Sequence, residues 1–279
     1  MNKKTTIINI KSRKGTGQPI TMLTAYDYPW AVLVDRAGID IILVGDSLGM
    51  VVLGYDDTIS VTMDEMIHHI SAVTRSVKNS LVVGDMPFGS YNVSIEKAVE
   101  NANMIMKKGR ADAVKLEGGK NMAPVIKAII NSGTPVQGHI GLTPQTASAL
   151  GGFKVQGKSA EAAQALIEDA KALEDAGCFS IVLEAIPAPI AKMVTKAVSI
   201  PTIGIGAGIH CDGQVLVTHD MTGLFDRFTP KFVKQYAKIN EIISSAIAEF
   251  KSEVENRKFP EEKHSFTMNA DELGKIIDN

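Results

Sequence analysis

The chain has 279 residues, of which 45% are hydrophobic and 22% are charged, a composition typical of a globular protein with one large domain or two small ones. Its 29 basic and 31 acidic side chains leave a net charge of -2, so no basic excess indicates nucleic-acid binding. The apolar runs fall short of the roughly 18 residues of a membrane span, and two cysteines are too few for a disulfide framework or a cysteine-rich zinc site. We therefore expect a cytoplasmic protein that binds neither nucleic acid nor membrane.

Eight short apolar runs alternate along the chain with longer amphipathic segments. Most of these runs are almost continuously apolar, which is typical of parallel strands that are covered on both faces. In chain order, the runs are Ile20–Thr24, Ile39–Val44, Leu81–Val83, Ala113–Leu116, Pro135–Ile140, Phe179–Leu183, Pro201–Ile205 and Val215–Thr218. Eight strands that alternate with helices predict an α/β fold of the (β/α)8 or TIM barrel type. Because strand order is not visible in a sequence, a doubly wound open sheet is the alternative.

The segments between the runs carry the signals of helices. Thr62-Met63-Asp64-Glu65 has the form of a capping box, because the threonine can cap the first turn while the glutamate reaches back to it. Four segments end in a glycine shortly before the next run, at Gly38, Gly109, Gly133 and Gly177. Glycine accepts the left-handed conformation that ends many helices, so we predict a C-terminal cap at each of these four positions.

No stretch of biased composition divides the chain, and we predict a single barrel domain over residues 1–279. Residues 252–279 of this domain form a polar C-terminal tail. Asn269 stands where it can cap a short helix that carries the apolar side chains of Leu273 and Ile276. We expect this helical extension to pack on the barrel or on a neighbouring subunit.

Ionisable residues follow or end most of the predicted strands. In a (β/α)8 barrel the carboxyl ends of the strands meet at one rim, where the active sites of such enzymes lie. The rim residues are Asp27, Asp46, Asp85, Lys115, Glu117, His139, Glu184, His219 and Asp220. Any one of them could cap a helix, form a structural ion pair or be a hydrogen-bonded core histidine, but the whole set favours a catalytic site.

The types of residue at this rim indicate a reaction class. Asp46 and Asp85 are hard oxygen ligands from neighbouring strands, and the absence of a His and Cys set beside them favours Mg²⁺ over zinc. A 2-oxo acid could chelate this ion, which would stabilise an enolate as a Lewis acid. Glu184 could be the base that removes the proton beside the carbonyl. Lys115 could offset the enolate charge, or form a Schiff base that the metal would make redundant.

Two loops next to the predicted strands have alternative explanations. The glycine-rich segment from Gly204 to Gly208 lacks the spacing of the dinucleotide-binding fingerprint, and no Walker-type phosphate loop occurs in the sequence. This segment could bind phosphate or form a tight turn near the substrate. The segment from Pro87 to Tyr91 is predicted to be a turn that could close over the site.

Eight segments carry motifs that occur together in one enzyme family. They are Leu23–Asp27, Gly45–Met50, Thr62–His69, Gly84–Tyr91, Val114–Gly119, Gly138–Gln145, Gly204–Gly208 and Asp212–Val217. In residues and order, this part of the chain resembles the ketopantoate hydroxymethyltransferase family. The resemblance implies a barrel of the phosphoenolpyruvate/pyruvate superfamily. It also implies transfer of a hydroxymethyl group from 5,10-methylenetetrahydrofolate to 3-methyl-2-oxobutanoate, the first committed step of pantothenate biosynthesis.

The products implied by the resemblance are 2-dehydropantoate, also called ketopantoate, and tetrahydrofolate. The resemblance further implies that Mg²⁺ is required and that the chain forms a homodecamer of two stacked pentameric rings. Carried over by motif, the metal site would consist of Asp46, Asp85 and Glu117. The substrate would contact Asp46, Ser47, Asp85, Lys115 and His139. Glu184 would be the general base.

Two other functions are weighed against this one. A metal-dependent lyase or mutase of the same superfamily would form an enolate from another 2-oxo acid, and its independence of folate would distinguish it. A non-catalytic barrel that binds small molecules or supports an assembly would show neither metal dependence nor turnover. The complete set of rim residues disfavours this last alternative.

Overall fold

The computed structural model describes residues 4–149 and 151–277; residues 1–3, 150 and 278–279, which the predicted domain and tail include, lie outside the described residues. Eight parallel strands close into a barrel in chain order, and the last strand pairs with the first. They are β1 (Ile20–Thr24), β2 (Ile41–Val44), β3 (Leu81–Asp85), β4 (Ala113–Glu117), β5 (Val136–Gly141), β6 (Ser180–Glu184), β7 (Thr202–Ile205) and β8 (Gly213–Leu216). The predicted (β/α)8 barrel is confirmed, and the open sheet is wrong because a closed barrel has no edge strands.

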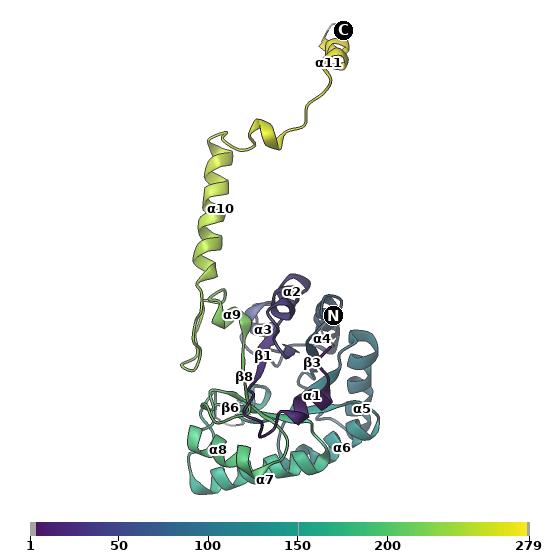
Figure 1. Cartoon of the computed structure of the whole chain (residues 1–279), viewed down its shortest axis with the longest axis vertical. Coiled ribbons are helices and arrows are strands. Elements are labelled where there is room, and N and C mark those ends of the chain that lie inside the picture. Colours follow the sequence, from purple (N-terminus) through teal and green to yellow (C-terminus); the bar gives the residue numbers. More distant parts are fainter. Residues whose placement is uncertain (1–3, 150, 278–279) are drawn as a thin grey trace.

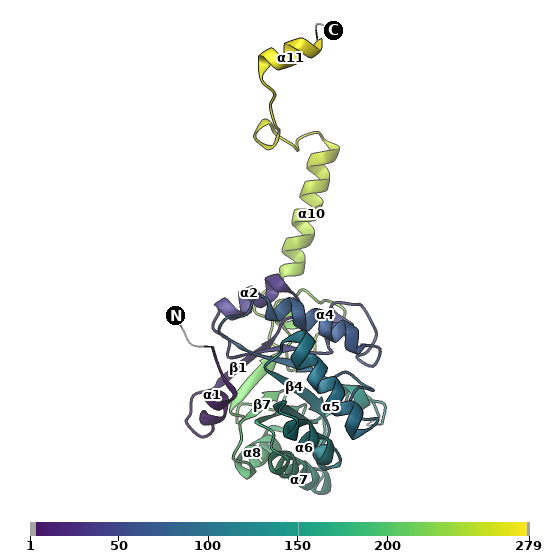
Figure 2. The same cartoon turned by 90° about the vertical axis from the view of Figure 1, so that its right-hand side faces the viewer.

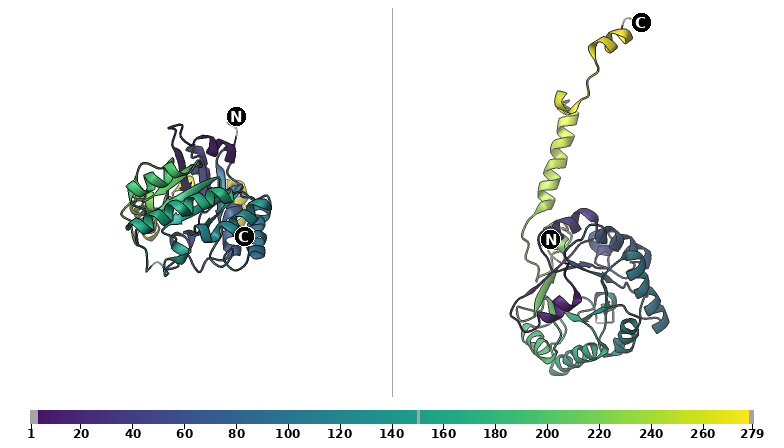
Figure 3. Two further views of the ribbon diagram at one scale, coloured as in Figure 1. Left: turned by 90° about the horizontal axis from the view of Figure 1, so that it is seen from below. Right: turned by 45° about the vertical axis from the view of Figure 1, so that its right-hand side comes forward.

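Helices form a ring around the barrel, as the right-hand view of Figure 3 shows. The helices and helical turns are α1 (Ile7–Ser12), α2 (Tyr28–Arg36), α3 (Leu48–Val51), α4 (Met63–Thr74), α5 (Ile95–Met104), η1 (Ile105–Gly109), η2 (Lys120–Met122), α6 (Ala123–Asn131), η3 (Pro144–Thr146), α7 (Ala160–Ala176), α8 (Ala188–Ala197), α9 (Thr218–Met221), α10 (Ile239–Glu255), η4 (Glu262–His264) and α11 (Ala270–Ile277). Thr62 and Glu65 form the predicted capping box at the start of α4. Burial of apolar residues on one side of α4, such as Met66 and Ile70, attaches this helix to the sheet.

The interior of the barrel is apolar toward the amino-terminal ends of the strands. Residues two apart on a strand point to the same face, so each strand sends every second side chain inward. The interior cluster contains Ile20 and Met22 from β1, Leu81 and Val83 from β3, and Ile10 from α1. Because Ile10 packs beside the first residues of the strands, α1 covers the amino-terminal end of the barrel and leaves the carboxyl end for the site.

Three of the four predicted glycine caps are confirmed. Gly38, Gly133 and Gly177 have φ values of 78°, 99° and 104°, in the left-handed region. The prediction is wrong at Gly109, because Arg110 takes the left-handed conformation there, with a φ of 61°. Gly109 is required for another reason: a Cβ atom at this position would lie 2.7 Å from Cγ2 of Ile70.

The chain ends in a helical extension that leaves the barrel. In Figures 1 and 2, α10 projects away from the barrel and α11 lies beyond it. All residues of α10 are partly or fully exposed, and its exposed apolar side chains are Ile242, Ile243, Ile247, Phe250 and Val254. Among the described helices, none is long and apolar enough to cross a membrane.

Candidate active site

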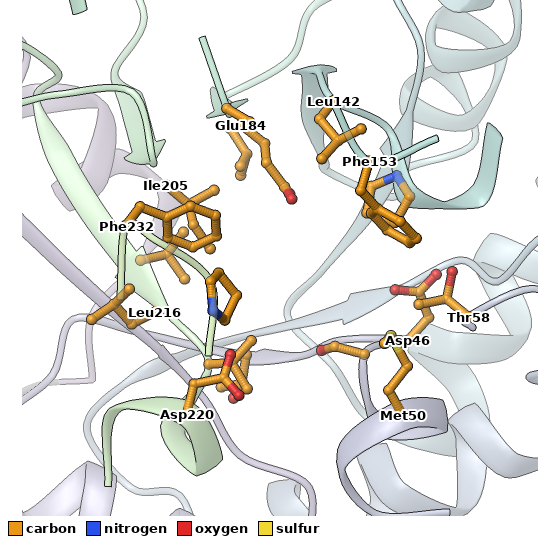
Figure 4. Close-up of a pocket in the computed structure, with 18 of the residues that line it drawn as sticks. Asp46, Met50, Thr58, Leu142, Phe153, Glu184, Ile205, Leu216, Asp220 and Phe232 are labelled. Carbon is orange, nitrogen blue, oxygen red and sulfur yellow. The ribbon is translucent and has the colours of Figure 1, made fainter. Parts of the chain in front are cut away.

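A cavity of about 510 Å³ lies at the carboxyl end of the barrel. Its lining includes all seven residues that the sequence predicted for the site: Asp46, Ser47, Asp85, Lys115, Glu117, His139 and Glu184. Figure 4 shows Glu184 pointing into the cavity from one side and Asp46 from another. Asp27 is different, because its carboxylate accepts a hydrogen bond from the backbone N–H of Trp30 and caps α2. Asp27 is therefore a helix cap, one of the structural roles considered for the rim residues.

The alternation of side chains along the strands explains why charged groups converge here. On β3, Asp85 follows Leu81 and Val83 at spacings of two residues, and both of these face the barrel interior. Lys115 and Glu117 follow Ala113 on β4 in the same way. The charged groups thus form the uppermost layer of an interior that is otherwise largely apolar.

The acidic part of the site is tightly connected. The backbone N–H of Asp46 donates to Oδ2 of Asp85 across 3.1 Å, and Nζ of Lys115 lies 2.8 Å from Oδ1 of Asp85. Lys115 therefore pairs with Asp85 on the neighbouring strand β3, and not with Glu117 on its own strand. Gly45 allows this approach, because a Cβ atom there would lie 2.9 Å from Oγ of Ser47 and 3.3 Å from Oδ2 of Asp85.

Burial controls the protonation of these groups. Burial, together with the charges of Asp85 and Glu117, raises the pKa of Asp46 well above its usual value. Burial also raises the pKa of Asp85, although the nearby ammonium group of Lys115 opposes this. Burial lowers the pKa of Lys115, but the three surrounding carboxylates outweigh it and raise the pKa overall. When ionised, three carboxylates facing one ammonium group leave an excess of negative charge that a cation would balance.

These residues fit a magnesium ion. Among the described residues, no three His, Cys, Asp or Glu side chains already surround a single metal position. Mg²⁺ does not need such a set, because it commonly takes one or two protein carboxylates and completes its shell with water and substrate oxygens. Asp46 and Asp85 would provide such a donor set, and the assignment of Asp46, Asp85 and Glu117 as metal ligands stays a prediction.

His139 connects the acidic cluster to Glu184. Its Nε2 lies 3.2 Å from Oε2 of Glu184, and its Nδ1 lies 3.5 Å from Oε1 of Glu117. Burial and the charge of Lys115 lower the pKa of His139, but its hydrogen bonds to Glu117 and Glu184 raise it to about 9. The ring of His139 therefore lies between the carboxylates of Glu117 and Glu184 and contacts both.

Another carboxyl group lines the cavity apart from the acidic cluster and Glu184. Asp220, on α9, points into the cavity in Figure 4, and burial raises its pKa to about 6. The preceding residue, His219, packs against the rings of Tyr26 and Trp30, with centroid distances of 5.2 and 5.3 Å. The sequence placed Asp220 at the rim without giving it a role, and its neighbour His219 is a packing residue.

Aromatic side chains from two loops complete the cavity wall. Phe153 comes from the segment between β5 and α7, and Phe228 and Phe232 come from the segment after α9. A Cβ atom on Gly206 would lie 2.8 Å from the ring of Phe232, and Gly206 has a φ of 63°. This geometry favours the tight-turn explanation of the glycine-rich segment. Sequence reasoning missed these aromatic residues because they lie outside the strands and follow no periodic pattern.

Gln145 is a further residue that the search of the sequence missed. Gln145 lies in η3, away from the ends of the predicted strands, and its exposed fraction is 2%. Its side chain donates to Oδ2 of Asp46 across 2.8 Å. Gln145 ends one of the family-like segments, which was the only signal available, and an amide escapes a search for ionisable side chains.

Comparisons with known proteins match nearly the whole chain. A family model described as "Ketopantoate hydroxymethyltransferase" matches residues 4–262. A protein named 3-methyl-2-oxobutanoate hydroxymethyltransferase from Heliobacterium modesticaldum is 58% identical over 274 residues, covering 98% of this chain and 99% of that protein. A protein of the same name from Syntrophobacter fumaroxidans is 57% identical over 276 residues, covering 99% and 98% of the two chains.

Solved structures share the fold at much lower identity. A phosphonopyruvate hydrolase in complex with oxalate and Mg²⁺ has a TM-score of 0.62 and 12% identity, covering 100% of this chain and 98% of that chain. A 2,3-dimethylmalate lyase of the PEP mutase/isocitrate lyase superfamily has a TM-score of 0.59 and 13% identity, covering 97% and 94%. At these identities the likenesses show the fold alone, a (β/α)8 barrel.

Proposed function

Because the chain belongs to the ketopantoate hydroxymethyltransferase family, we propose that it moves a hydroxymethyl group from 5,10-methylenetetrahydrofolate to 3-methyl-2-oxobutanoate through an enolate made by Glu184. The observation that supports this most directly is the position of Glu184 in one cavity with Asp46 and Asp85. A base and a site for a divalent cation, on different strands and facing the same space, are what proton removal beside a carbonyl requires.

Each residue has a separate task in this proposal. Glu184 takes the proton from C3 of the oxo acid, and His139 orients its carboxylate through the 3.2 Å contact. The ammonium group of Lys115 offsets the negative charge that moves onto the substrate, and Ser47 contacts the substrate. Asp46, Asp85 and Glu117 hold Mg²⁺, which when bound supplies Lewis-acid stabilisation of that charge. C3 then forms a bond to the methylene carbon of the folate, and the two bonds between this carbon and the folate nitrogens break. Water supplies the hydroxyl group of 2-dehydropantoate, and the proton from C3 together with the second proton of water completes the two N–H groups of tetrahydrofolate.

The alternative is a lyase or mutase that acts on another 2-oxo acid with the same metal. The names of the structural neighbours favour it only weakly, because their identity to this chain is 12–13%. The size and apolar wall of the cavity favour the transferase, since an aromatic-lined space of about 510 Å³ can admit the ring system of a second substrate beside a small oxo acid.

Hydrogen–deuterium exchange at C3 tests the enolate half of the proposal. We expect NMR in D₂O, without any folate, to show exchange at C3 of 3-methyl-2-oxobutanoate when Mg²⁺ is present and none when a chelator replaces it. Adding 5,10-methylenetetrahydrofolate should then convert the substrate to 2-dehydropantoate. Exchange that is absent with metal, both with and without tetrahydrofolate, would contradict the substrate assignment and favour the lyase.

Self-association through the helical extension is part of the same proposal. Ile243, Ile247, Phe250 and Val254 recur at helical spacing and form an exposed apolar stripe on α10. Such a stripe on a helix that projects from the barrel is typical of a surface that another subunit covers. This supports the homodecamer implied by the family. It also supports one domain over residues 1–279 whose tail, residues 252–279, reaches a neighbour.

Replacing Ile247, which is 64% exposed, tests this surface. We expect Ile247→Asp to lower the mass measured by light scattering toward the 29.9 kDa of one chain, because it places a charge in an apolar contact. Ser245→Asp is the matched control, since residues two apart on a helix do not share a face. A wild-type mass of one chain, or equal losses of mass in both variants, would contradict the assignment.

We also propose that the chain is located in a reducing compartment. The free thiols Cys178 and Cys211 lie in two different connecting segments, before β6 and before β8, and Cys178 is buried. Burial raises the pKa of Cys178 to about 12, which keeps it an unreactive thiol. These features support the cytoplasm as the location of the chain.

A further inference from the structure

The neutral side chain of Gln145 lies between groups that the proposed reaction assigns to the metal. Its Nε2 donates to Oδ2 of Asp46 across 2.8 Å and to the backbone carbonyl of Met86 across 3.0 Å. Its Oε1 accepts a hydrogen bond of 2.6 Å from the hydroxyl of Tyr91. Its backbone N–H donates to Oε2 of Glu117 across 3.1 Å. One buried residue therefore contacts two of the three proposed metal ligands.

The orientation of this amide is set by its partners. Both groups that receive a hydrogen bond from Nε2, a carboxylate and a backbone carbonyl, can only accept. Turning the amide over would place Oε1 against these two oxygen atoms and would leave both of them without a donor. The hydroxyl of Tyr91 then supplies the one donor that Oε1 needs. The amide group of Gln145 is thus held in one orientation by its hydrogen-bond partners.

The backbone around Gln145 is a short helical turn. Gln145 follows Pro144 in η3, and the hydroxyl of Thr143, the residue before this turn, lies 2.6 Å from the hydroxyl of Thr146. Tyr91 is itself buried, so the hydroxyl that holds Oε1 of Gln145 lies inside the protein. That the segment from Pro87 to Tyr91 closes over the site stays a prediction.

A neutral donor suits a carboxylate that must bind a cation. A lysine or arginine in this place would neutralise Asp46 and compete with a metal ion, whereas an amide orients the carboxylate and leaves its charge available. The hydrogen bond from Gln145 goes to Oδ2 of Asp46 and leaves the negative charge of the ionised carboxylate available to a cation.

We propose that Gln145, held by Tyr91, is the positioning residue that sets Asp46 and Glu117 for divalent-cation binding. This assignment rests on the proposed function, because it takes the acidic cluster to be the magnesium site. It concerns binding of the ion before any substrate enters. It can therefore be measured without turnover.

Isothermal titration calorimetry of the full chain with Mg²⁺ alone tests the assignment. Gln145→Met keeps the length of the side chain and removes both its donors and its acceptor. We expect its dissociation constant for Mg²⁺ to rise about 10- to 100-fold, the range for losing a group that orients a metal ligand. Tyr91→Phe removes only the hydroxyl that holds Oε1, and we expect a smaller increase in the same direction.

Gln137→Met is the matched control. Gln137 is a second fully buried glutamine near the site, on β5 two residues before His139, and its Nε2 donates to Oγ of Ser180 across 2.8 Å. It lines no part of the cavity described above, so its replacement should lower thermal stability while leaving the affinity for Mg²⁺ unchanged. A general loss of stability and a specific loss of metal positioning are thereby separated.

The possible outcomes separate the two proposals. A wild type that binds Mg²⁺ and a Gln145→Met variant with unchanged affinity would overturn the assignment of Gln145 alone. Equal weakening by Gln137→Met would also overturn it. A wild type that binds no Mg²⁺ would overturn both the metal site and this assignment. Should Gln145→Met fail to fold, Tyr91→Phe decides, and unchanged affinity in that variant overturns the assignment.

Discussion

Glu184→Gln is expected to lower turnover at least about 100-fold, the scale for losing a general base. The amide has nearly the same shape as the carboxylate and can keep a contact with His139, so the fold should be preserved. What it loses is the ability to accept a proton from C3. Exchange of the C3 proton in D₂O, followed by NMR with Mg²⁺ present, should vanish together with turnover.

Asp220→Asn is the control that makes this result specific. Asp220 is a further carboxyl in the same cavity, outside the proposed metal site, and its pKa of about 6 would suit a base at neutral pH. If Glu184 is the base, Asp220→Asn keeps C3 exchange and Glu184→Gln loses it. The opposite pattern would transfer the role to Asp220, and near-normal turnover of Glu184→Gln would remove that residue from the role.

Asp46→Asn is expected to abolish Mg²⁺ binding and turnover and yet to stabilise the metal-free protein. Asparagine can still accept the hydrogen bond from Gln145, but it no longer places a charge in the buried acidic cluster. Like charges that are placed together to bind a cation repel one another when the cation is absent, so the metal-free protein is less stable. In the presence of a chelator, we expect the Tm of the variant to exceed that of the wild type by roughly 2–4 °C, which corresponds to about 1 kcal/mol.

The pH dependence of this gain follows from the raised pKa of Asp46. The folded carboxyl binds its proton more tightly than the unfolded one, so the folded state holds more protons between the two pKa values. The contribution of this group to stability is therefore present at low pH and is lost as pH rises toward the folded pKa. Asparagine does not titrate, so the Tm advantage of Asp46→Asn should be larger at about pH 7 than at about pH 4, near the usual pKa of an aspartate.

Asp35→Asn is the matched control, because Asp35 and Asp46 are both 5% exposed. Burial alone would raise the pKa of Asp35, but hydrogen bonds from Ser80, Lys78 and Asn79 lower it, which means that its ionised form stabilises the fold. The same change at Asp35 should thus lower the Tm. A lower Tm for metal-free Asp46→Asn, or a Mg²⁺-induced rise in Tm that persists in it, would contradict the prediction.

The candidate site was largely predictable because its residues follow from local patterns. Asp85, Lys115 and Glu184 each end or closely follow a short apolar run, and the alternation of side chains on a strand sends them inward. Once the runs are assigned to a barrel, their carboxyl ends must share one rim. The order of motifs along the chain then indicated the family without any knowledge of contacts.

The contacts within the site were not predictable in the same way. Gln145 meets Asp46 across 99 residues and Tyr91 across 54 residues of sequence, and no spacing in the chain encodes these distances. Lys115 could have paired with Glu117 on its own strand, and only the register of β3 against β4 brings it to Asp85. Arg110 takes the left-handed conformation that the neighbouring glycine was expected to adopt, and the close approach of Ile70 of α4 to Gly109 is a contact that no sequence pattern encodes.

The amino-acid sequence by itself determined the strands and helices, the chemical types at the strand ends and the family, because each depends on neighbouring residues or on motifs read in order. The tertiary structure alone decided that the sheet closes, which groups pair inside the cavity and that α10 projects from the barrel. These depend on strand register and on contacts between distant segments. The physical reason is that a periodic pattern specifies which face of an element is buried, but not which other element buries it.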